Sequence, residues 1–223
     1  MPLFGLDSES VVARARSRGS APQIPSLGES IAVGGIGFGA VSLAAFGLWA
    51  RAGRWLSEHT GELGLYASCA LILIGGGGAV LSRLVIGPER LRRFFGLFAL
   101  AFFLYAGVWT GSYFSMRSKS GECLASLLGP GILAMTFANA FGAPSTVRKV
   151  MFALIVTHAL GYFAGGFLYR AFPGETGKLL WGGAYGLGFG SGIGYALHAC
   201  QAPTREALKK LLNTSPSSTR PSG

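Results

Sequence analysis

Acidic residues are scarce in this sequence, and none of them lies deep inside a hydrophobic stretch. The 223 residues include only 9 Asp and Glu, and charged residues of both signs make up 13% of the chain. Proton relays and cation-coupled carriers normally keep an acid inside the membrane as their working group. This absence argues against ion-coupled transport.

Cysteine and histidine are also rare, with three residues of each. Cys69, Cys123 and Cys200 show no metal-ligand spacing, so we interpret them as small packing residues; a disulfide between Cys69 and Cys123 is the alternative. A bis-histidine haem needs two histidines at matched depth, and His158 alone lies deep in a hydrophobic stretch. We expect no cofactor and no metal.

Hydrophobic residues, in contrast, make up half of the chain, and the mean hydropathy is +0.47. A helix needs about 20 apolar residues to cross a bilayer. Six continuous stretches meet this length, at approximately 31–50, 62–87, 94–116, 122–142, 150–170 and 178–198. Because they do not alternate as barrel strands do, the predicted fold class is all-α, an integral membrane bundle of about six transmembrane helices with short loops and polar tails.

The chain divides into one membrane domain and two tails. We expect a polar N-terminal tail at 1–28, the six-helix domain at 29–200, and a short amphipathic helix followed by a disordered tail at 201–223. The amphipathic helix places Leu208, Leu211 and Leu212 on one edge, which predicts that it lies along the membrane surface.

The formal net charge of +10 is spread over loops and tails rather than gathered into a stripe, so we expect no nucleic-acid partner. Thirteen of the 19 Lys and Arg residues lie in the two tails and in or beside the second and fourth loops. The positive-inside rule then puts both termini on the same side of the membrane.

Aromatic residues form a stripe on the third stretch: Phe95, Phe98, Phe102, Tyr105 and Trp109 follow one another at steps of three and four. We interpret the stripe as packing against glycine-rich neighbours or facing lipid. A platform for a pigment or a quinone is the alternative.

The fourth stretch contains Gly129-Pro130-Gly131 near its middle, where proline removes a helical hydrogen bond and predicts a kink or break. Broken helices at the membrane midplane build the binding sites of many carriers. A small-solute channel or carrier is therefore the alternative function, with Thr157, His158 and Ser191 as its candidate polar lining.

His158, Gly161 and Gly165 resemble the His-x-x-Gly-x-x-x-Gly helix of rhomboid intramembrane proteases. The resemblance implies a Ser/His pair, for which Ser191 is the candidate nucleophile. In rhomboids the serine precedes the histidine, whereas here it follows. An intramembrane Ser/His hydrolase is thus a distant alternative, and we expect no catalytic residue.

Glycine is the most informative residue of the chain. In the last stretch, 100° per residue places Gly182, Gly186, Gly190 and Gly194 on one face of a helix and Gly188 and Gly192 on another. In lipid, helices associate by close packing at such small residues. Two smooth faces predict one neighbour within the chain and another beyond it.

The first stretch repeats the pattern in Gly35, Gly37 and Gly39, followed by aromatic residues and a basic turn. Together, the first and last stretches resemble the small glycine-motif subunit of the mitochondrial contact-site and cristae organising system. The resemblance implies that these glycines and the alternate glycines of 186–194 drive assembly, in the mitochondrial inner membrane and beside the ATP synthase.

The leading hypothesis is therefore a non-enzymatic structural or accessory subunit of a larger membrane complex, whose partners are membrane lipids and other membrane protein subunits.

Overall fold

The computed structural model describes residues 4–18 and 22–214, and all regular secondary structure in this part of the chain is helical. This confirms the predicted all-α class. The helices are α1 (Ser8–Arg18), α2 (Leu27–Ala32), α3 (Phe38–Leu81), α4 (Arg90–Met116), α5 (Lys119–Ala140), α6 (Val147–Ala171), α7 (Glu175–Cys200) and α8 (Ala202–Thr214). A π-helical turn, η1 (Val33–Gly37), joins α2 to α3, and two 3-10 turns, η2 (Ser82–Leu84) and η3 (Pro144–Thr146), follow α3 and precede α6.

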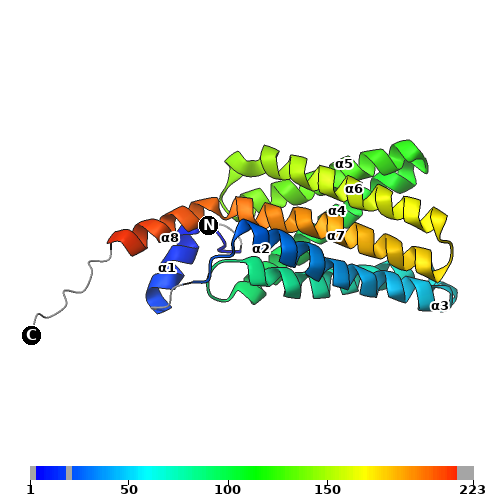
Figure 1. The fold of residues 1–223 in the computed structure, drawn as a ribbon, viewed down its shortest axis with the longest axis horizontal. Coiled ribbons are helices and arrows are strands. Elements are labelled where there is room, and N and C mark those ends of the chain that lie inside the picture. The colour runs from blue at the N-terminus through cyan, green and yellow to red at the C-terminus, as the bar shows by residue number, and fades with distance from the viewer. Residues whose placement is uncertain (1–3, 19–21, 215–223) are drawn as a thin grey trace, which may run out of the picture.

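The segment from α2 to η2 is a helical hairpin. Gly61 has φ 72° and ψ 174°, which interrupts α3, and the chain reverses direction there (Figure 1). Glycine suits this position because residues with a Cβ rarely adopt a positive φ. We call the segment before Gly61 the first arm and the segment after it the second arm.

Four helical segments are long and apolar enough to cross a membrane by length and composition: Leu27–Leu84, Arg90–Met116, Lys119–Ala140 and Pro144–Ala171. Leu27–Leu84 counts once, although it contains both arms of the hairpin. The 26-residue α7 is not among the four. The segments are compatible with a multi-pass membrane protein.

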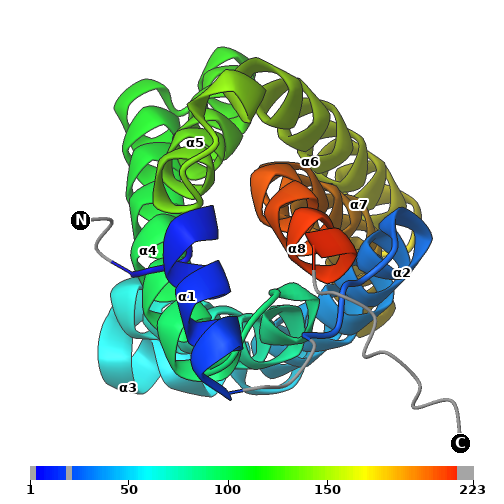
Figure 2. The ribbon, with the colours of Figure 1, turned by 90° about the vertical axis from the view of Figure 1, so that its left-hand side faces the viewer.

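Helix α7 occupies the centre of the bundle, between α6 on one side and the first arm on the other (Figures 1 and 2). It has the longest set of buried residues among the helices, and all eight of its glycines are within that set or partly covered. Helix α5 lies between α4 and α6, and α4 returns beside the second arm. The helix that the sequence marks by its glycines is therefore the one with the most buried residues, although Leu187 on it is 51% exposed.

The core changes character along the bundle axis. At the end of the bundle that carries α1, four phenylalanines are fully buried: Phe94 and Phe98 of α4, Phe137 of α5, and Phe141, which follows α5 directly. Further from α1, the core is formed by Tyr105 of α4, His158 of α6 and Tyr185 of α7, and all three are buried. Both halves of the core are aromatic, but only the second half contains polar side-chain atoms.

The region predicted as a polar N-terminal tail contains a helix, α1, which the sequence did not indicate. Its Val11 and Ala15 pack with Ile86 and with Leu208 of α8 in a small separate cluster. Helix α8 follows α7 at the same end of the molecule (Figure 1). Its apolar edge, predicted to face a membrane surface, is thus covered in part by α1.

Candidate functional site

The first glycine face of α7 packs directly on the first arm. A Cβ on Gly186 would lie 2.5 Å from the Cβ of Ser42 and 2.7 Å from the Cα of Gly39, and one on Gly190 would lie 2.7 Å from the Cβ of Phe38. The Ser42 hydroxyl donates a buried 2.7 Å hydrogen bond to the Gly182 carbonyl. The approach is so close that any larger residue at these positions must displace a backbone.

The second glycine face of α7 packs on α6. A Cβ on Gly188 would lie 2.6 Å from the Thr157 carbonyl oxygen and 2.8 Å from the Cα of Gly161, and one on Gly192 would collide with the Thr157 hydroxyl. Both faces are therefore covered by helices of the same chain. The two-sided helix is present, but its second neighbour is α6 rather than another protein.

The glycines of the first arm divide between two neighbours. Gly35 and Gly39 face α7, where their nearest side chains are Ser191 and Leu187, whereas Gly37 faces Val80 of the second arm. The π-helical turn η1 lies at this crossing, and Gly34 within it meets the backbone of Gly190.

The sequence did not lead us to predict a packing role for two glycines of these interfaces, Gly34 and Gly161. Gly34 and Gly161 each belong to a pair of small residues at four-residue spacing, with Ser30 and Gly165 respectively. That spacing is the same small-xxx-small signal that identified α7, and it could have identified the surfaces that receive α7.

Helix α5 is continuous through Gly129, Pro130 and Gly131, and all three are buried. A Cβ on Gly129 would lie 2.9 Å from the Tyr105 ring, and one on Gly131 would lie 3.7 Å from the Met151 sulfur. The predicted break is therefore absent, and the glycines make room for side chains of α4 and α6.

The three candidate polar-lining residues do not converge. The Thr157 hydroxyl donates 2.8 Å to the Ala153 carbonyl within α6 and faces Gly192. Ser191 faces Gly35 on the first arm. His158 bonds to Tyr105, so within the described chain no hydrogen bond joins His158 to Ser191. Neither a common polar lining nor a Ser/His dyad forms.

A chain of hydrogen bonds inside the bundle joins three helices at His158. The Tyr105 hydroxyl lies 2.8 Å from His158 Nε2 and 3.0 Å from the Tyr185 hydroxyl, all of it buried. His158 Nδ1 is buried and has no hydrogen-bond partner among the described residues. The Phe189 ring packs edge-on against the imidazole, at 4.9 Å between ring centroids.

Rings surround this cluster on the side away from α1. Tyr162 stacks on His158 at 6.0 Å and contacts Trp109 at 5.6 Å and Trp181 at 5.7 Å, between centroids. Both indole nitrogens are buried and have no hydrogen-bond partner in the part of the chain that the structure describes. The aromatic stripe of α4 thus packs in the core, where Phe98, Phe102 and Tyr105 are buried; Phe95, 39% exposed, lies at its edge.

Basic residues gather at the α1 end. Glu89 accepts hydrogen bonds from Arg93, at 2.9 Å to Nη2, and from Arg18, at 2.8 Å. The hydrogen bonds from Arg93 and its charge lower the pKa of the Glu89 carboxyl below its ordinary value of 4.5. Arg93 also donates to the Phe4 carbonyl, which attaches the N-terminal segment to α4, and Arg14 of α1 donates to the Gly5 carbonyl within that segment.

No protein-family model matches this sequence, and searches of curated proteins and of solved structures find no match either.

Proposed function

We propose that the chain crosses a membrane six times. Each hairpin arm counts as one span, α4, α5 and α6 as three more, and α7 as the sixth. The 26 residues of α7 extend about 39 Å as a helix, enough for the roughly 30 Å hydrocarbon layer. An even number of spans agrees with α1 and α8 lying at one end, which is also the arginine-rich end.

We further propose that the protein is a non-enzymatic structural or accessory subunit of a membrane assembly, and that it contacts its partner through α4. Gly107 and Gly111 are the supporting observation: they are four residues apart on α4, and a Cβ on either would meet no atom of the described residues within 4 Å. Such an open small-xxx-small pair is the usual contact between membrane helices.

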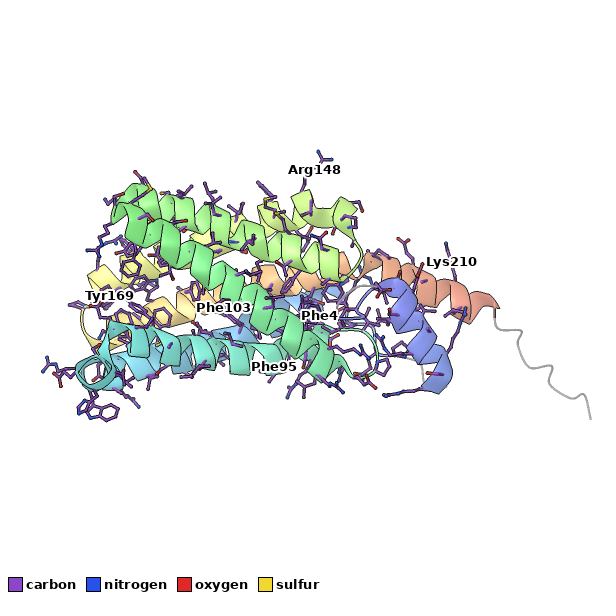
Figure 3. The ribbon with its side chains drawn as sticks, turned by 180° about the vertical axis from the view of Figure 1, so that it is seen from behind. Phe4, Phe95, Phe103, Arg148, Tyr169 and Lys210 are labelled. Atoms are coloured by element: carbon purple, nitrogen blue, oxygen red, sulfur yellow. The ribbon has the colours of Figure 1, made fainter. Side chains whose placement is uncertain are left out.

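Large exposed side chains flank the two glycines on the same helical face. Phe103 is 70% exposed, Leu100 and Phe114 are each 41% exposed, and Leu104 is 37% exposed (Figure 3 labels Phe103). These positions precede or follow the glycines by three, four or seven residues, so they form one continuous strip. Two glycines between large residues make a shallow groove that fits the ridge of another helix.

This proposal changes which glycines face a partner. The resemblance to the cristae-organising subunit rests on glycines of the first arm and α7. In this structure, these glycines pack helices of the same chain against one another. We therefore propose assembly through α4 and assign no mitochondrial compartment and no ATP synthase partner.

Gly107→Leu and Gly111→Leu test the proposal, with Gly75→Leu as the matched control. Gly75 lies on the second arm and is equally open, so the same substitution there adds the same side chain away from α4. In native gels from mild detergent, the α4 variants should migrate as the dissociated protein and the control as the intact assembly. Identical migration of all three would contradict the proposal.

A small-solute carrier is the second candidate, and His158 is the observation that favours it. An ionisable residue inside a membrane bundle is a candidate functional group by default, and the Nδ1 of His158 has no hydrogen-bond partner in residues 4–18 and 22–214. Because α5 is unbroken, the binding site of such a carrier would lie at His158 and Tyr105 rather than at Pro130. Uptake by liposomes that is lost in His158→Phe, with the assembly intact, would favour this candidate.

A further inference from the structure

A pocket of about 260 Å³ opens at the α1 end of the bundle, which Figure 2 faces. Two parts of the chain that are far apart in the sequence line it: α1 together with the segment that precedes α2, and the turn before α4 together with the first residue of that helix. The lining residues are Ala15, Arg18, Pro22, Gln23, Gly87, Pro88 and Arg90. The charged side chains of the lining are both arginines.

The positive charge of this pocket is only partly neutralised. Glu89 is the nearby acid, and it already pairs with Arg18 at 2.8 Å and with Arg93 at 2.9 Å. Arg90 forms no ion pair within the described chain; it makes a long 3.5 Å contact with the Arg83 carbonyl. Arg14 and Arg93 add two further positive charges close by, and Asp7 adds one negative charge beside Arg14. An anion with several acceptor oxygens would complement this arrangement.

Exposed apolar side chains also lie on the first turns of α4, the helix that begins at Arg90 of the pocket. Leu91 is 54% exposed, and Phe95, one turn later, is 39% exposed (Figure 3 labels Phe95). In the proposed six-span arrangement, this surface enters the hydrocarbon layer directly beside the arginines. A ligand with an anionic head and a hydrocarbon tail could contact both parts at once, which a free anion could not.

We propose that this pocket binds the phosphate headgroup of an anionic membrane lipid. Arg90 and Arg18 donate to the phosphate oxygens, the Gln23 amide supplies a further donor, and an acyl chain lies along Leu91 and Phe95. Basic pockets beside membrane helices on the positively charged side commonly recognise such headgroups. The inference rests on the proposed membrane placement, but not on assembly through α4.

Matched arginine substitutions test the proposal. Arg90→Gln removes a pocket arginine, and Arg92→Gln removes the same charge from the same helical turn at an exposed position outside the pocket. Arg18→Gln and Arg16→Gln make the equivalent pair on α1. If the lipid were held only by general attraction to a basic protein, its affinity would fall equally in the pocket variant and in its control.

The measurement is native mass spectrometry of the full chain in a neutral detergent, titrated with phosphatidylglycerol, with phosphatidylcholine or with inorganic phosphate. We expect preferential retention of phosphatidylglycerol. Arg90→Gln and Arg18→Gln should each weaken it about tenfold, as expected for loss of a charge-assisted hydrogen bond. Arg92→Gln and Arg16→Gln should weaken it less than twofold, and Arg90→Lys should recover part of the loss.

Three results would overturn the proposal. Equal losses of lipid affinity within each pair would mean that the lipid is held by general electrostatic attraction. Equal retention of phosphatidylcholine would mean that the pocket does not recognise the anionic headgroup. Displacement of the lipid by inorganic phosphate at equal concentration would mean a site for a free anion. Gly107→Leu should retain the lipid while it dissociates the assembly, so the lipid site and the assembly proposal can fail separately.

Discussion

The side chain of Gln201 accepts a 2.7 Å hydrogen bond from the backbone amide of Ile86, across 115 positions of the sequence. Its amide group donates to the carbonyls of Leu84, at 3.0 Å, and Leu197, at 2.9 Å. Gln201 is 2% exposed, and the loop it holds leads directly to Gly87 and the arginine pocket. One buried side chain thus joins the end of α7 to the turn that precedes α4.

Replacing Gln201 by Leu should destabilise the protein because the new side chain has similar bulk but leaves the Ile86 amide and the Leu84 carbonyl buried without partners. Each orphaned group costs about 1–3 kcal/mol. The melting temperature in detergent should fall clearly, and the control Gln23→Leu, at the rim of the pocket, should change it little. Equal melting temperatures for the two variants would mean that water satisfies the loop.

Replacing Gly190 by Leu should prevent the native fold rather than dissociate an assembly. The added side chain would displace the backbone at Gly34 and the side chain of Phe38. The cost should exceed about 4 kcal/mol, as for severe overpacking. Size-exclusion chromatography should show aggregated or unfolded protein, whereas Gly75→Leu should elute as the native protein. A well-folded Gly190→Leu would show that α7 is not packed as described.

The sequence allowed us to predict the helices and the two smooth faces of α7, because glycine spacing and hydrophobic length are local properties. It did not indicate which surface covers each face. Gly161 and Gly34 contact α7 through their backbone atoms, and they become its neighbours only in the folded chain. Helix α1 was not predicted for a related reason: its apolar partners, Ile86 and Leu208, lie far away in the sequence.

The sequence predicts a kink or a break of α5 at Pro130, where a helical hydrogen bond is missing. The break is not found, because α5 continues through this residue. Neighbouring helices can make such positions tolerable in a membrane bundle. Here the flanking Gly129 accommodates the Tyr105 ring. Only part of the candidate site was predicted from the sequence. His158 was identified, but its hydrogen-bonded connection through Tyr105 to Tyr185 forms only where α6, α4 and α7 pack together.

Replacing Tyr105 by Phe should remove the link between His158 and Tyr185 while keeping the ring against Gly129. Both former partners then lose a buried hydrogen bond, which should cost about 1–3 kcal/mol. Thermal unfolding in detergent measures the loss, and Tyr113→Phe, whose ring stacks on Trp109 at 5.4 Å, is the control. No difference between the variants would mean that the hydrogen-bonded chain contributes nothing to stability.

Acid should loosen the attachment of α1 through Glu89. Its pKa in the folded protein is lowered, chiefly by the hydrogen bonds from Arg93 and also by the charges of Arg93 and Arg18. A carboxyl of this kind stabilises the fold fully above its ordinary pKa of 4.5, and the contribution is lost as the pH falls through the lowered folded value.

Because Glu89 is exposed, the effect should be small and should weaken with added salt. Hydrogen exchange of the α1 amides, compared between pH 6 and pH 3.5 after correction for the intrinsic rate, should show reduced protection at the lower pH. In Glu89→Gln this difference should shrink, because the variant lacks the ion pairs at both pH values. Equal pH dependence in both proteins would mean that another carboxyl, such as Asp7 beside Ser10, controls the docking of α1.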